Sequence, residues 1–278
     1  MLNWGRFQWF FSSLKTTYHT MPARTPRPWK DPANPRLAPQ YRRLIQLAVQ
    51  DDTERQKSIR TDKIITGDPR QRYIALTFDD GPHGERTTQL LECLHRLKVP
   101  ATFFVVGKMA LRYPELIERI VLEGHELGNH TYHHYRLPQI PLDQVLGELN
   151  RTRDLLTGLV GAPTRLFRPP GGEYNEAIQK LIAKEGYSSI LWTDDPADYK
   201  PGRTPEKLTQ LVLRDITPGG IILLHDGMPI TISALPEMIS RLRGQGYQLV
   251  TVSELIQRGG GLDHLPRGSV KISLTSAT

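Results

Sequence analysis

Short apolar runs alternate with amphipathic segments from residue 73 onward, and this alternation restricts the possible folds more than any other feature. The runs cover residues 73–78, 101–106, 124–130, 165–170, 188–193, 220–225 and 247–252. Between them, residues 114–124 and 235–246 carry apolar side chains at helical spacing. Strands that alternate with helices build a parallel sheet, and about seven such units predict a closed or nearly closed (β/α) barrel.

The charge of the chain is concentrated at its N-terminus. The net charge is +7, and residues 1–50 account for all of it, with eight Lys or Arg against one acid, Asp31. Six prolines between residues 21 and 40 argue against regular structure there, whereas residues 41–50 have helical spacing. We therefore predict a basic, irregular extension over 1–70, a catalytic domain over 71–258 and a tail over 259–278.

A basic extension of this kind could contact anionic lipid or an anionic cell-wall polymer, or it could simply be solvated. The rest of the chain is neutral, so we expect no nucleic-acid partner, and we favour a monomer. The single cysteine, Cys93, excludes an internal disulfide and is predicted to be buried in a helix. No segment approaches the roughly 18 continuous apolar residues that are needed to span a bilayer, and the sequence shows no recognisable signal peptide.

Side chains capable of chemistry follow nearly every strand-like run. They are Asp79, Asp80, His130, Arg168, Asp194, Asp195, Asp198, His225 and Asp226. The carboxyl ends of parallel strands converge on one face of a barrel, so these distant residues are expected to meet there. Two adjacent carboxylates at the end of a buried strand repel each other, and we expect the other strands to supply the compensating groups.

The segment NHTYHH predicts a metal site. His130 and His134 are four residues apart, so a single helical turn would direct both imidazoles at one point. Two histidines and one carboxylate, with open coordination positions, are typical of catalytic zinc, although cobalt, nickel or manganese would also suit them. His133 and His125 are alternative ligands, and we favour a supporting or core position for both.

The remaining polar residues predict acid–base chemistry. One aspartate of the pair could bind the metal while the other takes a proton from water, held by Arg168 through a bidentate ion pair. His225 could donate a proton if Asp198 keeps its imidazole charged. The N–H groups of Gly171 and Gly172 could receive an oxyanion, although such glycine pairs are common in turns.

Five motifs in this order, TFDDGP, NHTYHH, RPPGG, WTDDPADY and ILLHD, resemble those of the polysaccharide deacetylase family, also called carbohydrate esterase family 4 or the NodB homology domain. The resemblance covers about residues 72–255. It implies a distorted (β/α)7 barrel and metal-dependent hydrolysis of acetyl groups, usually N-acetyl groups of glucosamine-containing polymers. It also suggests a place outside the cytoplasm or in the cell envelope.

The resemblance assigns a role to each residue of the first two motifs. Asp79 would be the general base, paired with Arg168. Asp80, His130 and His134 would bind the metal, most simply zinc. The residues alone leave open which aspartate has which role, and the resemblance decides between them.

The later motifs complete the implied site. Asp198 would tune His225 as the general acid, while Leu223 and Tyr199 would line the pocket for the acetyl methyl. Two positions depart from the family pattern: Gly171 stands where a tyrosine is usual, and Tyr199 stands where a tryptophan is usual. Both departures concern the surface that binds the polymer rather than the reacting groups.

Several functional alternatives remain open at this point. The polymer could be chitin-like, peptidoglycan or an exopolysaccharide, and an O-acetyl xylan esterase would use the same scaffold. A glycan-binding module without catalysis is a second hypothesis, which the presence of every reacting group argues against. A third interpretation takes Asp79 as a phosphoryl-accepting nucleophile, which would not need the histidine pair.

Overall fold

The computed structural model describes residues 63–258. The basic segment, the helix predicted at 41–50 and the predicted tail at 259–278 lie outside these residues. The strands are β1 (Lys63–Ile64), β2 (Tyr73–Asp79), β3 (Thr102–Val105), β4 (Glu126–Asn129), β5 (Leu166–Phe167), β6 (Ser188–Ile190), β7 (Ile221–His225) and β8 (Gln248–Val250). Each predicted strand is therefore confirmed, and β1 is an additional one.

Helices follow most strands, and some of them begin at a capping side chain. They are α3 (Glu85–Leu97), α4 (Gly107–Arg112), α5 (Pro114–Leu122), α6 (Leu142–Val160), α7 (Glu176–Lys184), α8 (Pro205–Asp215), α9 (Pro229–Gly244) and α10 (Val252–Arg258), with short 3-10 turns at Leu137–Gln139 and Pro170–Gly172. For example, the Thr204 hydroxyl accepts the Lys207 N–H at the start of α8, and Pro205 occupies the first turn.

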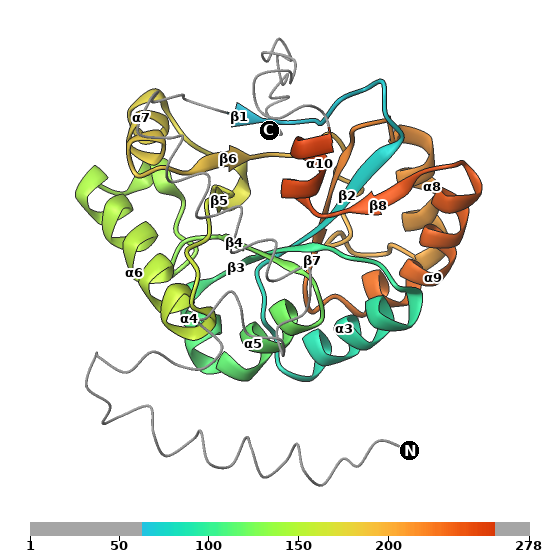
Figure 1. Cartoon of the computed structure of the whole chain (residues 1–278), viewed down its shortest axis with the longest axis horizontal. Helices are drawn as coiled ribbons and strands as arrows, with labels where there is room; N and C mark the ends of the chain where they lie inside the picture. The colour runs from blue at the N-terminus through green and yellow to red at the C-terminus, as the bar shows by residue number, and fades with distance from the viewer. Residues whose placement is uncertain (1–62, 259–278) are drawn as a thin grey trace, which may run out of the picture.

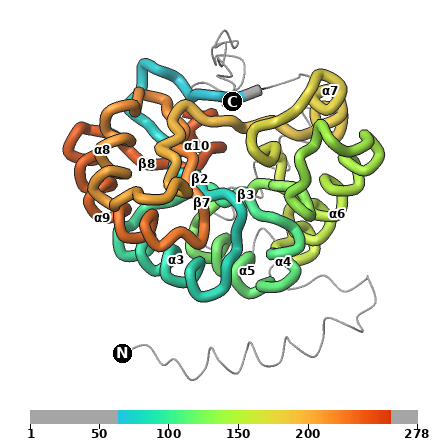
Figure 2. Tube along the Cα trace, turned by 180° about the vertical axis from the view of Figure 1, so that it is seen from behind, coloured from blue at the N-terminus to red at the C-terminus, as the bar shows by residue number. Residues whose placement is uncertain are grey.

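All strand pairings are parallel, in the order β1-β6-β5-β4-β3-β2-β7, with β8 also paired to β2. The sheet is strongly curled, and helices α3 to α9 lie around its outer side (Figures 1 and 2). A bridge between Asp194, which follows β6, and Ile222 of β7 nearly closes the curl. The predicted α/β class and the distorted, nearly closed barrel are confirmed.

The sheet begins earlier than the predicted domain boundary at residue 71. Strand β1 pairs with β6 through Lys63 opposite Ser189 and Ile64 opposite Ile190. The Gly67 N–H also donates to the Gly219 carbonyl at 2.7 Å. A two-residue strand has too little periodicity to be recognised in a sequence, and only its pairing identifies it.

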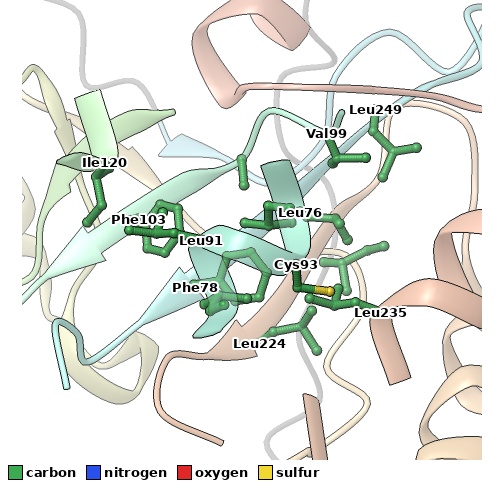
Figure 3. Packing of buried hydrophobic residues seen from close by; sticks show 14 of the residues in the cluster. Leu76, Phe78, Leu91, Cys93, Val99, Phe103, Ile120, Leu224, Leu235 and Leu249 are labelled. Atoms are coloured by element: carbon green, nitrogen blue, oxygen red, sulfur yellow. The ribbon is translucent and has the colours of Figure 1, made fainter. Parts of the chain in front are cut away.

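The main core lies between the sheet and the outer helices (Figure 3). Side chains of β2, such as Leu76 and Phe78, pack there against Leu91 of α3 and Leu235 of α9. Cys93 is 2% exposed within this cluster and is a free thiol, as predicted. Burial on both faces explains why β2 reads as a nearly continuous apolar run.

The strand register brings the polar strand ends to one edge. Asp79 of β2 lies opposite His225 of β7, and Asn129 of β4 lies opposite both Val105 and Phe167. His130 and Arg168 follow directly on β4 and β5 and therefore lie at the same edge. Among the described residues, no helix is both long enough and apolar enough to cross a membrane.

Candidate active site

Asp80, His130 and His134 form a cluster that fits a divalent cation. One ligand atom from each residue lies within 4.8 Å of the others. Asp80 Oδ1 is 3.4 Å from Nε2 of His130 and 3.1 Å from Nε2 of His134. This oxygen is buried without an aligned hydrogen bond. A buried carboxylate oxygen that faces two imidazole nitrogens is the donor set that zinc and similar ions prefer.

The electrostatics of the cluster favour an ionised Asp80. Burial by itself would raise the pKa of this carboxyl, but the hydrogen-bonding and charge effects of His130 and His134 outweigh burial and hold the pKa well below its usual range. His130 is 2% exposed, and its Nδ1 lies 2.7 Å from the Arg168 carbonyl oxygen. Donation from Nδ1 to that carbonyl leaves the Nε2 lone pair free for a cation.

A loop, rather than the predicted helical turn, directs the two histidines. Residues 130–134 contain no helix, and Thr131 and His134 have left-handed backbones with φ of 65° and 64°. The Thr131 hydroxyl accepts the His134 N–H at 3.0 Å. The four-residue spacing therefore correctly predicted that the two imidazoles lie close together. The predicted helical turn is wrong, because a loop with left-handed residues brings them together instead.

Backbone strain is concentrated around this cluster. The non-glycine residues with left-handed φ in the described part of the chain are Asp80, Lys98, Thr131, His134 and Ala197. Lys98 caps helix α3, whereas the other four lie in loops that carry site residues. Such conformations cost about 1 kcal/mol or more each, so the surrounding structure must hold these loops in place.

Glu148 of α6 holds the loop between the two histidines. Its Oε2 accepts the N–H groups of Tyr132 at 2.9 Å and His133 at 2.6 Å. Its Oε1 lies 2.7 Å from Nδ1 of His133. His133 is therefore directed toward α6 and is not part of the cluster. His125 is 2% exposed in the core, where its Nδ1 accepts the Ala101 N–H.

Asp79 is held by Arg168, beside the metal-ligand cluster. The two side chains are 4% and 0% exposed, and Arg168 Nη1 is 2.7 Å from Asp79 Oδ1. The other carboxylate oxygen of Asp79 lies 3.7 Å from Nε2 of His130. Asp79 therefore presents one oxygen toward the cluster, while its other oxygen is fixed by a buried cation.

The Arg168–Asp79 pair is not bidentate, in contrast to the prediction. The Arg168 guanidinium also donates to the Thr77 hydroxyl and to the carbonyls of Ile190 and Leu191. Its central carbon lies 4.1 Å from the centre of the Phe104 ring. One N–H group donates to Asp79, and the other fixed donor contacts immobilise the guanidinium more firmly than a single carboxylate could.

His225 and Asp198 form the second polar pair. Asp198 accepts the His225 N–H at 2.8 Å and lies 2.7 Å from its Nδ1, and the Thr231 hydroxyl donates to the same carboxylate at 2.6 Å. Burial would lower the pKa of His225, but the hydrogen bond and charge of Asp198 outweigh it, with smaller charge effects from Asp79 and Asp80, and raise the pKa to about 9. The imidazole is thus a cation that can donate a proton from Nε2.

The two predicted oxyanion donors differ in the structure. The Gly172 N–H donates to the Pro169 carbonyl at 2.9 Å, so the prediction that it receives an oxyanion is wrong. Gly171 has φ of 63°, and a Cβ there would meet only the Glu173 side chain, at 3.9 Å. The turn requires the left-handed conformation at Gly171, which favours glycine, and leaves bare backbone at the surface.

The predicted pocket residues lie next to His225. The Tyr199 ring packs edge-on against the His225 ring with centres 5.2 Å apart, and its side chain is 50% exposed. Leu223, which is 5% exposed, precedes His225 by two positions on β7. Tyr199 therefore contacts this imidazole directly, and Leu223 lies on the same side of β7 as His225.

Two further carboxyls at the strand ends are buried without a full set of partners. Asp194 is 3% exposed with Oδ2 unpartnered, and burial is the main cause that raises its pKa to about 7. Asp226 is also 3% exposed; it accepts a hydrogen bond from Thr87, and burial raises its pKa to about 6. Neither belongs to the metal-ligand cluster.

Sequence reasoning missed Glu148, Thr77 and Thr231, each of which fixes a site residue. Glu148 gave a signal, because it lies on the buried face of α6 between Val145 and Leu149. A charged residue on the apolar face of a helix requires a buried partner. The two threonines gave no such signal, since threonine is common in buried strands and helices.

Known proteins resemble this chain over most of the described residues. A family model for polysaccharide deacetylase matches residues 66–190. The peptidoglycan-N-acetylmuramic acid deacetylase PdaC of Bacillus subtilis is 37% identical over 74% of this chain and 44% of its own length. A peptidoglycan-N-acetylglucosamine deacetylase of Bacillus cereus is 38% identical over 67% of this chain and 89% of its own length.

The solved structures agree with this relationship. The crystal structure of the Bc1960 peptidoglycan N-acetylglucosamine deacetylase superposes with a TM-score of 0.68 at 33% identity, covering 70% of this chain and 92% of that one. The chain spans less than half of PdaC, but it covers 89% of the Bacillus cereus relative. An extended match at more than 30% identity, with the same curled parallel sheet, shows that the chain belongs to the polysaccharide deacetylase family, the enzymes of carbohydrate esterase family 4.

Proposed function

We propose that this protein is a metal-dependent deacetylase that removes N-acetyl groups from N-acetylglucosamine-containing glycan, with peptidoglycan as the favoured polymer. The observation that carries the proposal is the convergence of three groups: the Asp80–His130–His134 cluster, Asp79 held by Arg168, and His225 held by Asp198. The names of the two Bacillus relatives, both peptidoglycan deacetylases, support the polymer. They also support action outside the cytoplasm.

Asp80, His130 and His134 would hold the cation, for which zinc is the best match to the donor set. A divalent cation at this site would supply Lewis acidity, polarising the acetyl carbonyl and making a water molecule acidic enough for a carboxylate to deprotonate. The chain supplies the remaining groups, which act on protons and on the orientation of the substrate.

Asp79 is the proposed general base. Its free carboxylate oxygen faces the cluster, and Arg168 fixes its other oxygen, so it can accept the proton of an attacking water without reorienting. The backbone at Gly171 is the proposed site for the oxyanion. His225, which Asp198 keeps protonated, then donates a proton from Nε2 to the departing amine nitrogen, and acetate is released. No covalent bond between enzyme and substrate is needed.

The test is acetate release from a panel of acetylated glycans, with and without chelator, and after zinc is restored. We expect release from peptidoglycan or chitooligosaccharide rather than from acetylated xylan, and loss of activity with chelator. Asp79→Asn should retain zinc but lose nearly all turnover, whereas His130→Ala should lose zinc itself. His95→Ala, at an exposed histidine of α3, is the control.

The outcomes separate the alternatives. Binding of the glycans without acetate release would favour the non-catalytic module, and release from acetylated xylan alone would favour the O-acetyl esterase. Hydrolysis of a phosphate ester through a phosphorylated Asp79 would favour the phosphoryl-transfer interpretation. Wild-type turnover in Asp79→Asn would overturn the assignment of the base.

A further inference from the structure

Exposed aromatic side chains occur next to the proposed site. In the described part of the chain, the large hydrophobic side chains that are exposed are Leu111, Leu122, Tyr135, Leu142 and Tyr199. Both aromatic members of this group adjoin site residues: Tyr199 contacts His225, and Tyr135 directly follows His134. An aromatic ring left in water beside a reactive centre offers a flat apolar surface to a ligand.

The Tyr135 ring is fixed from the interior of the protein. It stacks on the His133 ring, with centres 5.1 Å apart and planes 29° apart. Nδ1 of His133 is held in turn by buried Glu148 at 2.7 Å. Tyr135 is therefore held in place through His133, which is itself bound to Glu148 of helix α6. A surface ring held in this way loses little conformational freedom when a ligand binds to it.

The loop that carries Tyr135 lies beside the glycine turn of the site. Arg136 Nη2 is 3.4 Å from Glu173 Oε1, which joins this loop to the residues that follow Gly171 and Gly172. Gly171 has no side chain to cover the surface there, and a Cβ would meet only Glu173. The exposed surface next to the turn thus combines bare backbone, an ion pair and one rigid aromatic ring.

We propose that Tyr135 is a stacking platform for a pyranose ring of the glycan, adjacent to the sugar whose acetyl group is removed. The inference rests on the proposed function and deepens it, since it makes Tyr135 a determinant of preference for oligomeric over small substrates. One face of a hexopyranose presents C–H groups that pack on an aromatic face. Its ring hydroxyls can meet the charged groups of Arg136 and Glu173 at the edge.

The test compares Tyr135→Ala and Tyr135→Phe with Leu122→Ala, a control at a similarly exposed side chain at the end of α5. Binding of N-acetylated chitopentaose is measured by calorimetry, and acetate release is measured on chitopentaose and on 4-nitrophenyl acetate. We expect Tyr135→Ala to weaken binding and raise KM for chitopentaose about tenfold, with kcat little changed. Tyr135→Phe should remain within about twofold of wild type. Hydrolysis of the small ester should be unaffected.

The calorimetric experiment keeps this inference separate from the proposed reaction. Unchanged chitopentaose affinity in Tyr135→Ala, or no binding by the wild-type protein, would overturn the stacking role whatever the enzyme does with acetate. An equal loss on chitopentaose and on the small ester would also overturn it, because that pattern indicates damage to the metal loop. Binding that depends on Tyr135 without acetate release would retain this inference and reject the proposed function.

Discussion

Replacing Asp198 with asparagine is expected to move the alkaline limb of the pH–rate profile by more than two pH units. Asp198 accepts two hydrogen bonds from His225 and supplies the negative charge beside its imidazole. Burial alone would lower the pKa of His225 below its ordinary value of 6.5, but Asp198 raises it to about 9. The asparagine variant retains the shape of the side chain but removes the charge, so the pKa should fall toward its ordinary value of 6.5.

The size of the effect follows from the protonated fraction of His225. Because the pKa is raised in the native protein, the acid form persists as pH rises until about 9. At about pH 8 the wild type is about 90% protonated and the variant about 3%, so the rate should fall about 30-fold. At about pH 6 the two proteins should differ by less than about twofold.

The assay is kcat/KM for acetate release between about pH 5 and pH 10, with zinc content checked in each protein. Thr231→Val is the matched control, because it removes one hydrogen bond to Asp198 but keeps the charge, and its alkaline limb should stay close to that of the wild type. A loss of activity in Asp198→Asn that is equal at every pH would refute the reasoning. So would an unshifted alkaline limb.

Two further predictions concern buried carboxyls. Glu148→Gln should weaken zinc affinity about tenfold or more and alter the visible spectrum of the cobalt-loaded protein, because the loop between the metal-binding histidines loses its anchor. Glu126→Gln, at a buried carboxyl that accepts hydrogen bonds from Thr102 and Ser253, should lower only thermal stability, and equal zinc affinities in both variants would contradict the proposed role of Glu148. Asp194 has a folded-state pKa of about 7 against an ordinary 3.8, so its ionisation costs stability as pH rises through this interval. Asp194→Asn should therefore increase the free energy of unfolding by about 2–3 kcal/mol more at about pH 8 than at about pH 5, and an equal change at both pH values would show that Asp194 does not titrate in this way.

Much of the fold could be predicted because its signals are local. The apolar runs are buried on both faces, which gives continuous hydrophobic stretches such as that of β2. The helices between them begin and end at prolines, threonine caps and glycines that are visible in the sequence. Strand β1 was missed because two residues are too few to show an alternation of apolar and polar side chains. Its position depends on pairing with β6, which is distant in the sequence.

The composition of the site was predictable, but its geometry was not. The pairing of Asp79 with Arg168 joins positions 89 residues apart, and its single contact depends on where Thr77 and two carbonyls place the guanidinium. The Gly172 N–H was expected at the site and is instead used by its own turn. These features depend on which of several nearby groups in the folded protein accepts each hydrogen bond, and sequence motifs do not show this.

The sequence by itself determined the parallel α/β architecture and the identity of the polar residues at the strand ends, because periodicity and strand direction are properties of short segments. Only the tertiary structure decided how those residues are oriented. Left-handed loop residues direct His134 toward Asp80, and Glu148 draws His133 away from the same cluster. Each of these outcomes requires contacts between segments that are distant in the chain, and so the physical cause lies in packing rather than in local preference.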